Sequence, residues 1–153
     1  MIQHNRIALA TLLLTAWLHA PVWAGNGPDV TTLRTLAEGG DVASQLSLGH
    51  AYMAGDGVEI DYIMAGVWFR SAAKQGNAAA QEALGTMYMK GRGVPLNGTL
   101  AYVWLSLAAG QGSESALALR DDISRKIPLS ALHAAQSVLM EHWAKYVQPF
   151  QKR

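Results

Sequence analysis

The sequence contains no cysteine among its 153 residues. This absence excludes disulfide scaffolds, CxxC redox sites, thiolate zinc sites and cysteine nucleophiles. In an exported protein this absence would also remove the risk that an unpaired thiol is oxidised.

Charge is sparse and balanced, since only 15% of the residues are charged and 12 basic residues stand against 11 acidic ones. A nucleic-acid-binding protein needs a strongly basic face. We therefore expect no nucleic-acid partner. Apolar residues make up 50% of the chain, which allows a packed core, and the length fits about one domain.

Long apolar runs are also absent, except near the start of the chain. Residues 7–17 carry no charge, follow Arg6 and precede the small-residue pattern Val-Trp-Ala at 22–24. This order predicts a signal peptide over residues 1–24, cleaved after Ala24, and a periplasmic or secreted bacterial protein. An uncleaved membrane anchor is the alternative, although the run is shorter than the roughly 20 residues that span a bilayer. Cleavage removes Arg6 and leaves 11 basic and 11 acidic residues, with no expected membrane contact.

The rest of the chain repeats itself with a period of 36 residues. Shifting the sequence by 36 aligns residues 41–76 with 77–112 without a gap, and 16 of the 36 positions are then identical. Each unit predicts two helices, the first over 42–54 and 78–90, ending at a glycine that can adopt a left-handed conformation. The second helix follows Asp61 or Asn97 as N-cap and ends at Gln75 or Gln111. Within it Ala65, Trp68, Ala72 and Ala73 share one helical face, which predicts the core.

The residues that the two repeats share resemble the motifs of a known repeat family. The succession Leu-Gly-x-x-Tyr, Gly-x-Gly-Val, Ala-x-x-Trp and Ala-Ala-x-x-Gly resembles the Sel1-like repeat family, which is related to the tetratricopeptide repeats. The resemblance implies an all-α fold, a short solenoid of antiparallel helix pairs with repeats at 41–76 and 77–112. Residues 25–40 resemble the second helix of a partial repeat. Residues 113–153 diverge and predict capping helices, the last over about 129–146.

Catalytic and metal-binding patterns are weak. Beyond the signal segment the histidines are His50, His133 and His142, and the last two lie nine residues apart, which does not place them on one helical face. No GxSxG or SxxK motif is present, and the glycines at 55–57 and 91–93 fit interhelical turns better than phosphate loops. Methionines near His50 are more typical of packing or of an adaptable contact surface than of copper binding. We expect no catalytic residue, no metal and no cofactor.

The remaining candidate is a surface. In solenoids the first helices usually line the concave side, where extended partners bind, and positions that differ between repeats are its natural variable lining. The predicted partner-binding residues are Leu46, His50, Glu82, Thr86, Lys90 and Arg92. The resemblance implies a non-enzymatic adaptor that binds another envelope protein or a peptide segment. The alternatives are a peptidoglycan-binding or murein-enzyme accessory protein and, less favoured, a hydrolase with an unrecognised site.

Overall fold

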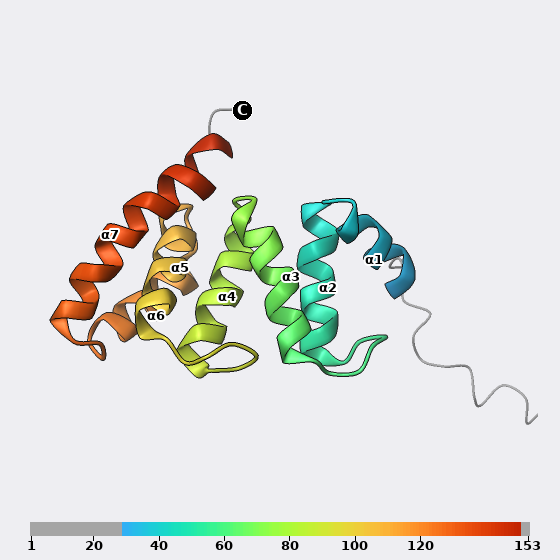
Figure 1. Ribbon diagram of the computed structural model, residues 1–153, viewed down its shortest axis with the longest axis horizontal. Helices are drawn as coiled ribbons and strands as arrows, with labels where there is room; N and C mark the ends of the chain where they lie inside the picture. The colour runs from blue at the N-terminus through green and yellow to red at the C-terminus, as the bar shows by residue number, and fades with distance from the viewer. Residues whose placement is uncertain (1–28, 151–153) are drawn as a thin grey trace, which may run out of the picture.

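The computed structural model describes residues 29–150, so the predicted signal peptide lies outside the described residues. This part of the chain is entirely helical apart from its connecting turns (Figure 1). Its elements are α1 (Val30–Glu38), α2 (Val42–Ala54), α3 (Tyr62–Lys74), α4 (Ala78–Lys90), α5 (Gly98–Gly110), α6 (Glu114–Ser124), α7 (Leu129–Tyr146) and the 3₁₀ turn η1 (Gln148–Phe150).

The helices pack in chain order. Each of the first five helices lies against the next one, from α1 on α2 to α5 on α6, in a row that runs along the long axis of the molecule (Figure 1). The last long helix breaks this order, because α7 packs against α5 and also touches α3. The predicted all-α solenoid of helix pairs is confirmed.

Local signals set the ends of the helices. The side chains of Asp41 and Asn77 accept a hydrogen bond from the backbone N–H three residues on, and so cap α2 and α4. Both helices end at a left-handed glycine, Gly55 with φ 78° and Gly91 with φ 63°. The bounds of α2, α4 and α7 are those that the sequence predicts, while α3 and α5 end one residue earlier.

Each helix pair is held by a close contact between a glycine and a large apolar side chain. A Cβ atom on Gly49 would lie 2.6 Å from the Phe69 ring, and a Cβ atom on Gly85 would lie 2.7 Å from Cγ of Leu105. Phe69 and Leu105 are fully buried. The two contacts are 36 residues apart, so the same packing solution is used in both repeats.

A polar ladder connects successive repeats. Gln45 donates from Nε2 to the Ala37 carbonyl (3.0 Å) and accepts from Gln75 (2.8 Å). One repeat later Gln81 donates to the Ala73 carbonyl (3.2 Å) and accepts from Gln111 (2.7 Å). Gln45 and Gln81 are buried, and because their hydrogen-bonding groups are paired, they do not carry the cost of an unsatisfied polar group.

A second repeated bond places α1 in the series. Arg70 on α3 donates to the Tyr88 hydroxyl of the following helix (3.0 Å), and Arg34 on α1 donates to the Tyr52 hydroxyl in the same way (2.9 Å). Together with the bond from Gln45 to Ala37, this gives α1 the same contacts to α2 that α3 makes to α4.

The two equivalent tryptophans have different environments. Trp104 is buried with 4% of its surface exposed, because α7 covers it with His142 and Tyr146, whose rings lie 5.4 and 5.9 Å from the indole. Trp68 is only half-buried. The expectation that both tryptophans fill the core therefore holds for Trp104 and needs correction for Trp68, because α7 packs mainly on α5.

Replacing Trp104 by alanine should lower the free energy of unfolding by about 3–5 kcal/mol, the range for truncating a buried aromatic residue. Trp68→Ala should cost distinctly less, since less contact area is lost. Urea denaturation followed by circular dichroism measures both, with Lys74→Ala, an exposed change, as the control. Equal losses at the two tryptophans would contradict the asymmetric covering by α7.

Candidate partner-binding groove

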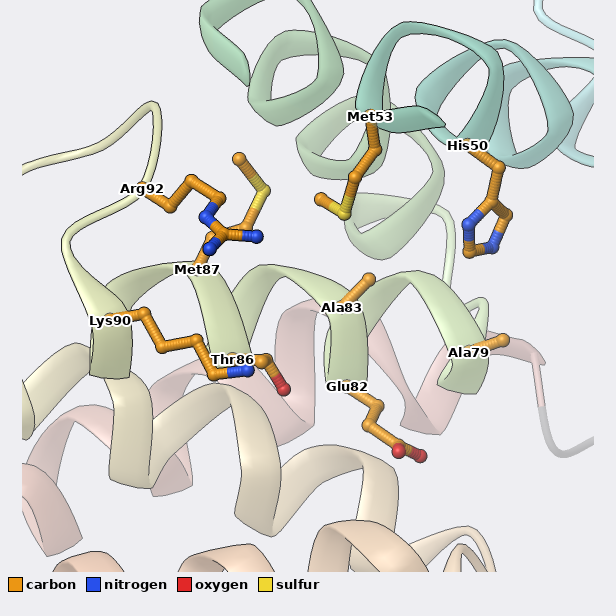
Figure 2. A pocket seen from close by; sticks show the side chains of 9 residues that line it. All are labelled: His50, Met53, Ala79, Glu82, Ala83, Thr86, Met87, Lys90 and Arg92. Atoms are coloured by element: carbon orange, nitrogen blue, oxygen red, sulfur yellow. The ribbon is translucent and has the colours of Figure 1, made fainter. Parts of the chain in front are cut away.

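A groove of about 340 Å³ lies between α2 and α4, the first helices of the two repeats. Figure 2 shows it from close by. Its lining consists of His50, Met53, Ala79, Glu82, Ala83, Thr86, Met87, Lys90 and Arg92. The groove therefore lies on the face formed by the first helices, where the sequence places the variable lining.

The groove exists because α3 lies behind it. α2 and α4 both pack against α3, and the side chains at their front are too small to close the space between them. Ala79 and Ala83 face α2 in Figure 2, and each ends at its Cβ atom. Met53 extends from α2 toward them, so the centre of the groove is lined by methyl and thioether groups.

Hydrogen bonds join α4 to α6, the next helix on the same face of the solenoid. Glu82 of α4 accepts hydrogen bonds from the hydroxyls of Ser113 (2.6 Å) and Ser115 (2.7 Å) at the start of α6. In the preceding repeat the position of Glu82 is taken by Leu46, and that of Ser115 by Ala79. A leucine and an alanine cannot form this bridge, so the space between α2 and α4 lacks the polar closure found between α4 and α6.

Positive charge gathers at one end of the groove. Lys90 is the last residue of α4, and Arg92 lies in the loop that follows, with its guanidinium carbon 5.0 Å from the centroid of the Tyr62 ring. Across residues 29–150, the basic side chains found in ion pairs are Arg120, Arg125 and Lys126, so neither cation of the groove is paired. Both are exposed.

His50 forms the other edge of the groove. Its side chain is exposed, and its ring stands edge-on to Phe69 at a centroid distance of 5.0 Å and an interplanar angle of 74°. Phe69 is the buried residue that packs on Gly49, so the imidazole is placed by the same contact that joins α2 to α3.

Five of the six predicted partner-binding residues line the groove, namely His50, Glu82, Thr86, Lys90 and Arg92. Leu46 does not, since it is half-buried and packs against the core. The lining also includes Met53, Ala79 and Met87, which the comparison of repeats did not select. The sequence does not single out Met53, because Met89 occupies the same place in the next repeat and a shared position predicts a core residue.

Two further features were sought in the described part of the chain. Residues 29–150 contain no group of three His, Cys, Asp or Glu side chains close enough to hold a metal ion. None of the helices placed by the structure is both long and apolar enough to cross a membrane.

Glu82→Ala should lower the free energy of unfolding by about 1–2 kcal/mol. It removes two charge-assisted hydrogen bonds between α4 and α6, and the half-buried position weakens them relative to fully buried ones. Lys90→Ala should stay within about 0.5 kcal/mol, as an exposed change does. Thermal and urea denaturation of both variants test this, with Ser115→Ala, which removes one of the two hydrogen bonds, as an independent break of the same bridge. If Glu82→Ala were as mild as Lys90→Ala, the bridge would not contribute to folding.

Comparisons with known proteins agree with this architecture. The Sel1 repeat family matches residues 42–77 and 78–113, one residue after the repeat boundaries predicted from the sequence. The fold is similar to the crystal structure of a protective antigen of uropathogenic Escherichia coli with an SLR fold, at a TM-score of 0.75 and 31% identity over 78% of this chain. A Sel1 repeat protein from Oxalobacter formigenes is also similar, at a TM-score of 0.60 and 39% identity over 61% of this chain.

The match covers only part of those proteins. This chain spans 26% of the first structure and 27% of the second. A comparison with curated protein sequences gave no match.

Proposed function

Since the chain is a member of the Sel1-like repeat family, whose repeats generally mediate contacts between proteins, we propose that it is a non-enzymatic adaptor of the bacterial periplasm. It binds a segment of another envelope protein in the groove between α2 and α4. The binding serves to assemble or regulate a complex of the cell envelope.

The observation that carries this proposal is the groove itself. Its centre is apolar, with Met53, Ala83 and Met87 as lining, and its rim carries charged side chains with no ion pair among the described residues. Adaptable methionine surfaces suit the binding of protein side chains. A volume of about 340 Å³ accommodates one or two of them, so the affinity for a single segment should be modest.

Crosslinking inside the cell tests the groove. A photoreactive amino acid replaces Thr86, which lines the groove, and in a matched strain replaces Met140, an exposed residue of α7 outside it. Illumination should give an adduct of defined mass at position 86 and none at position 140. Mass spectrometry of the adduct identifies what is bound.

The outcomes separate the functional alternatives. A protein adduct specific to position 86 supports the adaptor. An adduct of murein fragments at that position would replace it with a peptidoglycan-binding function. Equal adducts at both positions, or none at position 86, would argue against the groove as the binding face.

The location is tested independently of binding. The proposal of export rests on the pattern of residues 1–24, and it predicts a chain released by osmotic shock whose first residue is Gly25. Cell fractionation and N-terminal sequencing measure both. A chain that begins at Met1 in the membrane fraction would indicate an uncleaved anchor, and one in the cytosolic fraction would contradict export.

A further inference from the structure

The two ends of the groove differ in charge. Lys90 and Arg92 lie where α4 ends, and Glu82 lies two turns earlier on the same helix (Figure 2). We propose that the groove selects protein segments in which an acidic side chain adjoins a large apolar one, with the carboxylate at the Lys90 and Arg92 end. This inference rests on the proposed function and specifies the chemistry of the bound segment.

The centre of the groove favours an apolar side chain of the bound segment. Met87 is nearly fully buried, with 2% of its surface exposed, and Met53 is half-buried, and the two thioethers line the hollow. Neither these residues nor Ala83 offers a strong hydrogen-bonding group. An unbranched or γ-branched apolar side chain therefore gains contact there, whereas a polar one would lose hydrogen bonds to water.

The cations Lys90 and Arg92 at one end of the groove favour an acidic side chain of the bound segment. The Arg92 guanidinium lies over the Tyr62 ring, and no carboxylate of residues 29–150 forms an ion pair with it. A carboxylate accepts hydrogen bonds from a guanidinium in a bidentate manner, and the ammonium of Lys90 adds a second positive charge. Charge complementarity therefore favours an acidic residue at this end.

Glu82 sets the orientation. Both of its oxygen atoms accept a hydrogen bond, one from Ser113 and one from Ser115 at the start of α6, so the carboxylate is fixed at the rim of the groove on the side away from α2 (Figure 2). A second carboxylate placed at this end would meet a like charge. The segment is therefore acidic at one end, and a uniformly acidic stretch binds less well.

Selection from a phage-displayed library of random heptapeptides tests this specificity. The bait is the full-length chain, in its natural form and as Lys90→Glu. The control bait is Lys74→Glu. Lys74 and Lys90 are both exposed and both are the last residue of their helix, α3 and α4, so the two variants change the net charge and the helix end alike. Only Lys90 lines the groove.

The natural chain and Lys74→Glu should enrich peptides with aspartate or glutamate next to leucine, methionine or phenylalanine. Lys90→Glu should lose that preference. A synthetic peptide of the selected sequence should bind Lys90→Glu about tenfold more weakly than Lys74→Glu, as measured by fluorescence polarisation. A selected sequence without an acidic residue, or one shared by all three baits, would overturn the proposed specificity while leaving the groove as a binding site.

A fourth bait separates failure of this inference from failure of the proposed function. Ala83→Trp fills the centre of the groove, and circular dichroism establishes that the variant is folded. Peptides selected on the natural chain should not bind it. Peptides that bind Ala83→Trp undiminished would show that they use another surface, and enrichment of no peptide on the natural chain would count against both proposals.

Discussion

The contact of Gly49 with Phe69, repeated as Gly85 with Leu105, determines how closely the two helices of each pair approach. A glycine on the first helix allows the large side chain of the second to lie against its backbone, and the bulk of that side chain is then removed from water. The same contact places the exposed imidazole of His50 at the groove, because its ring stands against Phe69. The position of this candidate binding residue thus depends on a packing constraint in the core.

The candidate groove follows from a break in an otherwise regular pattern. The buried glutamines keep successive repeats in the same relation, because Gln45 donates to the Ala37 carbonyl and Gln81 donates to the Ala73 carbonyl. The side chains that lie between α2, α4 and α6 differ from one repeat to the next. Glu82 joins α4 to α6 through two serines, whereas no such bridge joins α2 to α4. The open site and the bridged site are equivalent positions occupied by different residues.

The end of the solenoid also changes the environment of equivalent residues. Val103 is fully buried, while Val67, which holds the same place in the preceding repeat, is 44% exposed. The cause is α7, which packs on α5 and covers its outer face, including Trp104. The capping helix therefore buries residues of α5 whose counterparts in α3 stay more exposed, even though the two repeats share much of their sequence.

The sequence by itself determined the repeat, the bounds of α2 and α4 and most of the residues of the candidate groove. Caps such as Asp41 and Asn77 and terminal glycines such as Gly55 act within one turn of the chain, so they can be recognised without knowledge of the rest of the fold. Differences between the repeats predict six partner-binding residues, and five of them line the groove. Differences between the repeats do not predict Met53, because a residue that both repeats share can contribute to the core and to the surface.

Only the tertiary structure decided which of two equivalent residues is buried and where the surface is hollow. Trp68 and Trp104 are identical in sequence, and their burial differs because α7 lies on α5. Leu46 was expected at the surface and packs instead against the core. The burial of a residue depends on contacts from helices that are far apart in the chain. The periodicity within a single repeat does not show which of those helices packs against it.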